Sequence, residues 1–176
     1  MNVFIRALQP SDKLAVKRLF EDTWNFRKFL SPRDASTFAA SLAEDAVCAE
    51  GYVRGVFAGD EPVALIAGRC ALGSDPNILD LLITHPRFQR MGLGGKLLSG
   101  FEDWCASRNH LPLQTVSDSE CQWKFYEKNG FALIDEKKTE VSGSDVVLYY
   151  FEKIPRPSVR STAEIPVMPF TSRSRA

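Results

Sequence analysis

The chain has 176 residues, in which 22 Lys and Arg balance 22 Asp and Glu, so its formal net charge is zero at neutral pH. That balance argues against a nucleic acid or an anionic membrane as the main partner, because both attract strongly basic proteins. The length suits a single domain with its own core, and no apolar run is long enough to cross a bilayer.

A strand and two helices are predicted in the first third of the chain. Residues 2–8 are short and apolar, which favours a strand. Ser11 then offers an N-cap, and Val16 and Leu19 recur at helical spacing, so a helix is expected after it. Residues 34–50 predict a second helical stretch that ends in acidic residues. The N-terminus has no apolar core of a leader peptide, so no secretory signal is expected.

Three strands follow. The segments YVRGVFA and VALIAGRC flank the turn GDEP, which indicates a β-hairpin. Residues 77–84 (NILDLLIT) are almost continuously apolar, as expected of a central strand that is covered on both faces. Asp80 is the lone acid in this strand.

Glycine and positive charge are concentrated directly after that strand, in the segment HPRFQRMGLGGKLL. A helix start presents free backbone N–H groups and the positive end of the helix dipole, and glycine lets a ligand approach the backbone closely. These are the requirements of a phosphate site, so the segment predicts binding of a pyrophosphate. The residues concerned are Gly92, Gly94 and Gly95 at the helix start and Arg87, Arg90 and Lys96 around it.

Two better-known phosphate loops do not fit this segment. A P-loop requires Ser or Thr after its lysine, where this chain has Leu97. A dinucleotide-binding fingerprint requires a third glycine at that same position. The plain alternative is a helix start that glycine merely allows to pack closely against a sheet.

The rest of the chain alternates helix and strand. A helix is predicted over residues 94–109, a strand over 111–116 and a further helix from the capping Ser117 to Gly130. Residues 131–153 predict a final hairpin. This order indicates an α/β protein with a mixed sheet, in which one strand–loop–helix–strand crossover joins parallel strands.

The composition changes at Pro155. Residues 155–176 are rich in proline and serine and have no clear period, which predicts a tail that is extended or disordered. Residues 1–154 are therefore expected to form a single domain. The apolar tail residues Val167, Met168 and Phe170 could dock on that domain or on a second subunit of a homodimer.

The cysteines and histidines do not form a ligand pattern. There is no CxxC pair, and His85 and His110 are not at metal-ligand spacing. We expect free thiols, a cytoplasmic setting and no metal site. The cysteines are Cys48, Cys70, Cys105 and Cys121.

Three segments resemble the GNAT N-acetyltransferase superfamily. QRMGLG, at residues 89–94, resembles the family motif Q/R-x-x-G-x-G/A and follows a buried strand as that motif does. FIRALQPSDKLAVKRLF resembles the first strand and helix of the family, and KFYEKNGFALI resembles its late helix. The likeness runs over residues 3–154.

The resemblance implies a mixed, mostly antiparallel central sheet flanked by helices, with a strand–glycine loop–helix–strand crossover for the cofactor. It also implies acetyl-CoA as the acetyl donor and a primary amine as the acceptor: a small amine, an amino acid, or the N-terminus or a lysine of a peptide. Both substrates would bind together, so that the amine attacks directly and no covalent enzyme intermediate is needed.

The resemblance assigns the cofactor contacts by position. The strand end at Leu82, Ile83 and Thr84 would pair with the pantetheine arm, and the N–H of Ile83 would polarise the thioester carbonyl. Ser119 stands where the family often has an asparagine in contact with the cofactor, and serine can still donate a hydrogen bond. The pyrophosphate would lie against the segment made of Gln89, Arg90, Met91, Gly92, Leu93, Gly94, Gly95 and Lys96.

Tyr126 and Asp80 are the candidates for acid–base chemistry. Tyr126 matches the general acid of the family, and a phenol with a pKa of about 10 can protonate a departing thiolate whose thiol has a pKa of about 8.5. Otherwise, an aromatic residue in an amphipathic helix belongs to the core. Asp80 lines the cleft as a base or amine anchor, pairs with Arg69 or Lys96, or faces solvent.

Some assignments stay open from the sequence. A histidine can act as a base near neutral pH, but the position of His85 also suits a cap or a phosphate contact. Acceptor specificity is expected from residues 25–50, whose acidic side chains either attract a cationic substrate or form a solvated face. Two other functions compete with the enzyme: a module that binds acyl-CoA as a regulatory ligand, and an unrelated phosphate-binding α/β protein.

Overall fold

The computed structural model of the protein describes residues 3–23, 37, 39–42, 51–118, 120–141 and 144–155. Residues 37 and 39–42 are helical, but the rest of the predicted helix over 34–50 and nearly all of the predicted tail lie outside the described residues. In the part of the chain that is described, no helix is both long and apolar enough to cross a membrane.

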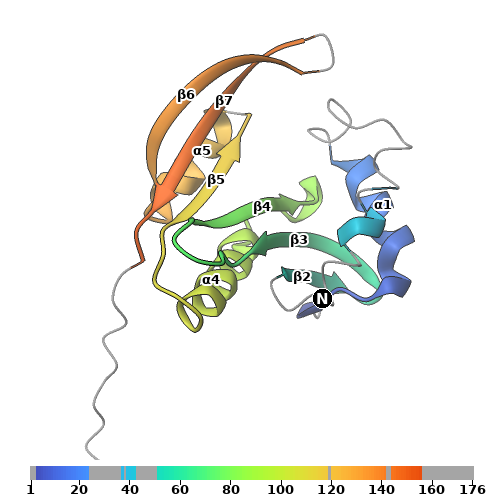
Figure 1. The fold of residues 1–176 in the computed structure, drawn as a ribbon. Coiled ribbons are helices and arrows are strands. Elements are labelled where there is room, and N and C mark those ends of the chain that lie inside the picture. The colour runs from blue at the N-terminus through green and yellow to red at the C-terminus, as the bar shows by residue number, and fades with distance from the viewer. Residues whose placement is uncertain are drawn as a thin grey trace, which may run out of the picture.

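The described strands form one seven-stranded sheet in the order β1-β2-β3-β4-β5-β7-β6 (Figure 1). All neighbours pair antiparallel except β4 and β5, which are parallel and are joined through a helix. The mixed, mostly antiparallel sheet that the sequence predicts is therefore confirmed. The strands are β1 Val3–Ala7, β2 Gly51–Ala58, β3 Glu61–Arg69, β4 Asn77–Thr84, β5 Leu113–Ser117, β6 Ala132–Val141 and β7 Ser144–Lys153.

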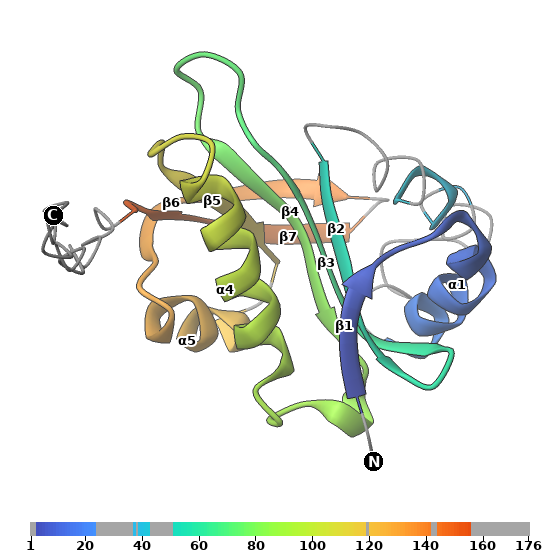
Figure 2. The same cartoon turned by 90° about the horizontal axis from the view of Figure 1, so that it is seen from below.

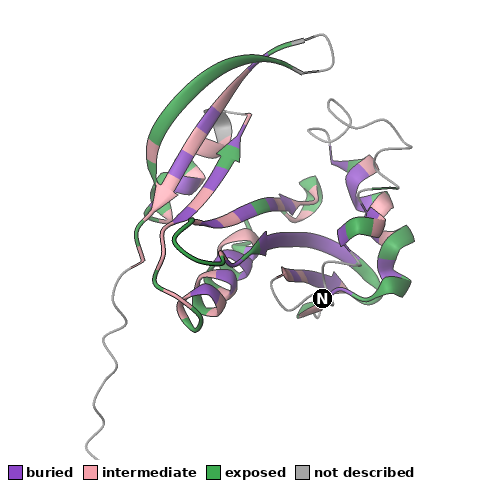
Figure 3. Cartoon of the chain, viewed as in Figure 1, coloured by how far each residue is buried: buried purple, intermediate pink, exposed green. Residues whose placement is uncertain are grey.

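Helices cover both faces of the sheet (Figure 2). On one face, α4 (Leu93–Ala106) and α5 (Glu120–Lys128) bury a cluster that includes Phe101 and Phe151. On the other face, α1 (Lys13–Asp22) buries a cluster that includes Phe57. Because β3 lies between these two clusters, it is buried along almost its whole length (Figure 3). This explains why its sequence is apolar without alternation.

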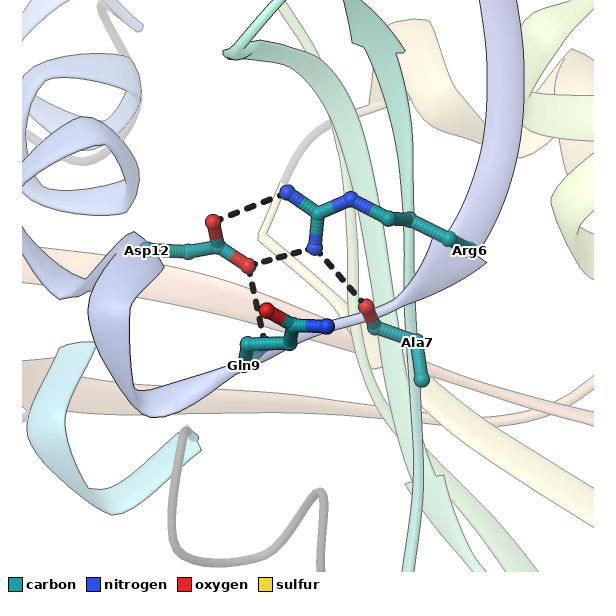
Figure 4. Close-up of polar contacts among 4 residues, drawn as sticks. All are labelled: Arg6, Ala7, Gln9 and Asp12. Atoms are coloured by element: carbon teal, nitrogen blue, oxygen red, sulfur yellow. Dashed lines mark hydrogen bonds and ion pairs between the residues drawn. The ribbon is translucent and has the colours of Figure 1, made fainter.

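Short 3-10 turns precede α1 and α4, at Pro10–Asp12 and Pro86–Phe88. The first turn corrects the N-cap expected at Ser11, which lies inside it. Asp12 holds the corner instead: its Oδ2 accepts from the N–H of Gln9 at 2.8 Å, and its carboxylate pairs with the guanidinium of Arg6 at 2.6 and 2.9 Å (Figure 4). The hydrogen bond from Arg6 lowers the pKa of Asp12, so the ion pair fixes β1 to the start of α1 at neutral pH.

A β-bulge interrupts β4 at Asp80. Ala67 of β3 pairs with Leu81 and Gly68 pairs with Leu79, so Asp80 has no opposite residue in β3. An extra residue reverses the alternation of side chains that follows it. Leu79 accordingly faces the α4 side, whereas Leu81, two residues later, faces the α1 side.

Strands β4 and β5 separate at the same place. Their parallel pairing covers only Asn77 to Leu79 of β4, and Leu79 pairs with Thr115 as the last partner. Beyond it β5 stays paired with β7, and in Figure 1 the pair of strands leans away from the remainder of β4. We call the point where Leu79 and Thr115 part the fork.

Asn77 secures the closed end of this ladder. It is 1% exposed, and its Nδ2 donates to the Oδ1 of Asn109 at 2.9 Å and to the carbonyl of Leu111 at 3.1 Å. Its Oδ1 accepts from the N–H of Ala71 at 3.0 Å. One buried amide thus joins the segment before β4 to the segment before β5, which holds the two parallel strands in register.

Candidate active site

The glycine loop, residues 89–95, is tied back to the end of β4. The side chain of Gln89 donates to the carbonyl of Thr84 at 3.3 Å. His85 accepts the N–H of Arg87 on its Nδ1 at 3.1 Å, which caps the 3-10 turn between strand and loop. Gln89 and His85 therefore set the path of the chain from strand to helix.

Two residues of the glycine loop have left-handed backbone: Arg90 with φ 63° and Gly92 with φ 77°. This conformation costs a non-glycine residue about 1 kcal/mol, so Arg90 is mildly strained. Gly92 then starts α4, because its carbonyl accepts the N–H of Lys96 at 3.1 Å. The backbone N–H groups from Arg90 to Gly95 donate to no acceptor within the described part of the chain.

These free donors fit a diphosphate. They gather at the positive end of the α4 dipole, and the side chains of Arg90 and Lys96 beside them are exposed. A Cβ on Gly94 would come 3.5 Å from the ring of Phe125, an ordinary contact, whereas a Cβ on Gly92 would meet nothing within 4 Å. Gly92 is thus required for its backbone angle, and the loop stays open to a ligand. Met91 is exposed, while the side chain of Leu93 is buried in the core.

The outer edge of β4 beyond the fork is open. The N–H of His85 donates to the carbonyl of Val63 on β3 at 2.9 Å. Since backbone groups alternate in direction along a strand, the N–H of Ile83 also points to β3, whereas those of Leu82 and Thr84 point to the side of β5. In the described part of the chain, the pairing of β4 with β5 ends at Leu79. An extended ligand could therefore bind along Leu82 and Thr84 as an added strand.

This geometry corrects the role predicted for Ile83. Its N–H lies in the ladder with β3, and its side chain, 8% exposed, packs in the cluster on the α1 side. Ile83 therefore holds β4 in the sheet. The strand ends where the sequence predicts, but the direction of each N–H depends on the register with β3, which local spacing does not reveal.

Asp80 lies at the bulge and is exposed. Its Oδ1 is 3.3 Å from the guanidinium of Arg69. Of the alternatives left open by the sequence, the structure therefore contains the pair with Arg69, at the surface next to the fork. The bulge allows a charged residue here, because it turns the side chain out of the apolar strand.

Tyr126 of α5 is a core residue, and its role as general acid stays a prediction. Its ring is 4% exposed, stacks on Phe151 at a centroid distance of 5.1 Å, and contacts Phe125 and Phe131 edge-on. Thr115 of β5 pairs with Phe151, so its side chain lies on the same face of the sheet as the ring on which Tyr126 stacks. Burial raises the pKa of Tyr126 and a hydrogen bond with Thr115 lowers it by less, so the phenol stays protonated at neutral pH and can donate a proton.

The other candidate residues either make contacts that stabilise the fold or lie outside the described residues. His85 uses Nδ1 as a cap, and its Nε2 lies 3.9 Å from the carboxylate of Asp22. Cys70 and Cys105 are free and buried, and burial raises the pKa of Cys105 to about 12. The described residues contain no group of His, Cys, Asp or Glu that could hold a metal ion. Ser119 and most of residues 25–50 lie outside the described residues.

The sequence reasoning did not find Thr115. Its side chain is 5% exposed, and its Oγ1 donates to the carbonyl of Leu79 at 3.0 Å. A single threonine in a short apolar strand is ordinary, so no local pattern distinguished it. Only the pairing of β4 with β5 brings it to the fork, beside Tyr126.

Comparison with known proteins identifies a family for this chain. Residues 27–152 match the family model described as an acetyltransferase (GNAT) domain. A comparison with curated protein sequences returns no match.

Solved structures of N-acetyltransferases are similar in fold. The PaiA N-acetyltransferase of Thermoplasma acidophilum, in complex with coenzyme A, has a TM-score of 0.66 at 20% identity, covering 88% of this chain and 99% of its own. The Escherichia coli ribosomal-protein-S18-alanine N-acetyltransferase has a TM-score of 0.70 at 16% identity, covering 91% and 98%. An aminoglycoside 6'-N-acetyltransferase complexed with coenzyme A has a TM-score of 0.69 at 19% identity, covering 88% and 98%.

Proposed function

The chain belongs to the GNAT acetyltransferase family, and from this premise we propose that it is an N-acetyltransferase that moves the acetyl group of acetyl-CoA to a primary amine. The acceptor is a small amine, an amino acid, or the N-terminus or a lysine of a peptide. Both substrates bind together, and the amine attacks the thioester directly.

One observation carries this proposal: free backbone donors at Arg90 to Gly95 directly follow a strand whose outer edge is open. A diphosphate at the loop would leave the attached arm to run along Leu82 and Thr84 toward the fork. Coenzyme A joins a diphosphate to an amide-containing arm that ends in a thiol, so it matches both features in order. The structural neighbours that were crystallised with coenzyme A support this assignment.

The residues at the fork suit acetyl transfer. The N–H of Leu82 is the outward-facing amide of β4 next to the fork, and we assign to it the polarisation of the thioester carbonyl. Tyr126 gives its proton to the departing thiolate. An alkyl amine with a pKa near 10.4 must lose a proton first, which costs roughly 4–5 kcal/mol at pH 7. We assign the anchoring of this amine to Asp80, on the exposed side of the bulge.

Binding of the donor is the first test. Acetyl-CoA at a hundred times its dissociation constant should raise the free energy of unfolding by roughly 2.7 kcal/mol, which a thermal melt detects as a higher Tm. CoA should act similarly, and ATP at the same concentration should raise the Tm much less, because it has no arm to pair with β4. Stabilisation by ATP but not by CoA would point instead to an unrelated phosphate-binding protein.

Turnover is the second part of the same test. A panel of amines, amino acids and peptides is incubated with acetyl-CoA, and free thiol is measured. The deep burial of the Tyr126 ring favours one competing function, a module that binds acyl-CoA without turnover. That module would be stabilised by acetyl-CoA but would release no thiol with any acceptor.

A further inference from the structure

Thr115 lies at the fork, where the half of the sheet made of β1 to β4 separates from the half made of β5 to β7. It faces Leu79 in the last pair of the parallel ladder, and its Oγ1 donates to the carbonyl of Leu79 at 3.0 Å. Its side chain is 5% exposed, so this hydroxyl has no bulk water with which to exchange its partner. A buried hydroxyl whose proton is committed still has lone pairs with which to accept a hydrogen bond.

Tyr126 packs over the same part of the sheet, because Thr115 pairs with Phe151, on whose ring Tyr126 stacks. Burial raises the pKa of Tyr126, and a side-chain hydrogen bond with Thr115 opposes that rise. The ring cannot turn away freely, because it stacks on Phe151 at 5.1 Å and meets Phe131 at 5.4 Å. The carbonyl of Tyr126 also accepts the N–H of Phe131 at 3.0 Å, which fixes the end of α5. The buried Thr115 hydroxyl thus donates to the strand carbonyl of Leu79 and lies on the same side of the sheet as the phenol of Tyr126.

We propose that Thr115 is a positioning residue for Tyr126, holding its hydroxyl at the fork and stabilising the phenolate that proton transfer leaves behind. This inference rests on the proposed function for its catalytic meaning. When the O–H bond of Tyr126 breaks and an S–H bond forms on the departing thiolate, the O–H of Thr115 turns from Leu79 to the phenolate. The phenolate then recovers a proton from water, which also receives the proton released by the amine, so protons balance.

The surrounding charges oppose the phenolate, which is why one hydrogen bond matters. Asp118, just after β5, raises the pKa of Tyr126, and burial raises it further, whereas the hydrogen bond with Thr115 lowers it. Of the other ionisable groups on the elements around Tyr126, Tyr149 of β7 and Cys105 of α4 lie in the same buried cluster. On α5 itself, Lys124 and Glu127 are exposed.

The direct test is a titration that needs no acceptor. 3-Fluorotyrosine is placed at position 126, and its fluorine resonance is followed against pH by NMR. In Thr115→Val, the apparent pKa should rise by about half a unit to one unit, the worth of one buried hydrogen bond. Thr115→Ser should restore the starting value, and Val116→Ala controls for a change in β5 alone. Thr115→Ala is a second variant in case valine does not fold.

The outcomes separate the inference from the function. An unchanged pKa in folded Thr115→Val or Thr115→Ala, or an equal shift in Val116→Ala, would overturn the role of Thr115. In the thiol-release assay, Thr115→Val should lower kcat about three- to tenfold with the KM for acetyl-CoA unchanged. It should cause no further loss in a Tyr126→Phe background, and an equal loss there would also overturn it. An inactive wild type would refute the enzyme, while the titration would still decide on Thr115.

Discussion

At the scale of single residues, the glycine loop depends on backbone angles rather than on side chains. Gly92 has φ 77°, and Arg90 shares that left-handed conformation despite its Cβ. Of the glycines at the start of α4, Gly92 is the one with a left-handed backbone, so any other residue at this position would be strained. A position of this kind can be tested by substitution, because the chain offers a second glycine in the same conformation elsewhere.

We predict that Gly92→Ala and Gly73→Ala each lower the free energy of unfolding by about 1 kcal/mol, since both replace a left-handed glycine. Gly73 has φ 85°, and at neither position would a Cβ meet an atom within 4 Å. Only Gly92→Ala should also weaken acetyl-CoA binding, by roughly tenfold or more, because it displaces the donor N–H groups. Denaturant unfolding and calorimetric titration measure the two effects. Equal affinity in both variants would place the diphosphate elsewhere.

At the scale of elements, the first half of β4 joins the two parts of the sheet, and its second half offers an open edge for a ligand. Its first half is paired on both sides, and its second half is paired on the β3 side. The N–H groups of Leu82 and Thr84 therefore point to the open edge, whereas the N–H of Ile83 points to β3.

Hydrogen exchange of individual amides should reveal this alternation. In the free protein, we expect the amide of Ile83 to exchange slowly and those of Leu82 and Thr84 to exchange faster. Acetyl-CoA should slow Leu82 and Thr84 together with the glycine loop. ADP, which supplies a diphosphate without the arm, should slow the loop alone. Selective protection of Ile83 by acetyl-CoA would contradict the register argument. The exchange is measured by NMR.

The strands also show what the sequence could and could not predict. Hydrophobic pattern located β2, β3 and β4 because most of their residues are shielded from water, whereas the turn residues SGSD between two strand-like segments located the last hairpin. The bulge at Asp80 was not predicted, since it is defined by pairing with β3, a contact between separate segments. The cap at Ser11 was wrong for a similar reason, because Asp12 gains a partner, Arg6, from a different element. Local spacing could propose Tyr126, but its partner Thr115 comes from tertiary packing.

At the scale of the whole molecule, the two halves of the sheet share one core. The cluster under α4 and α5 contains Val56 and Ile66 from one half and Tyr149 and Phe151 from the other. The sheet itself joins these halves through a short parallel ladder, whose closed end Asn77 holds. We therefore expect both halves to unfold together in a single transition.

Asn77→Ala should lower the free energy of unfolding by roughly 2–3 kcal/mol, because it leaves buried partners at Asn109, Leu111 and Ala71 unsatisfied. Gln114→Ala is the matched control: it removes one hydrogen bond to Glu152, 2.8 Å long and only partly buried. That control should cost less than about 1 kcal/mol. Urea unfolding followed by circular dichroism compares them, and equal losses would contradict the role given to Asn77.

The extra residue in β4 also constrains how this protein can change in evolution. If β4 lost the bulge but kept Asp80, Asp80 would pair with Ala67 and every later residue would shift by one position along β3, so that the residues after it would exchange faces of the sheet. The outward amides of Leu82 and Thr84 would then turn inward, and that of Ile83 would turn outward. Deleting Asp80 would keep the pairs of Leu79 with Gly68 and of Leu81 with Ala67, so the binding edge tolerates loss of the extra residue but not a slip of β4 along β3.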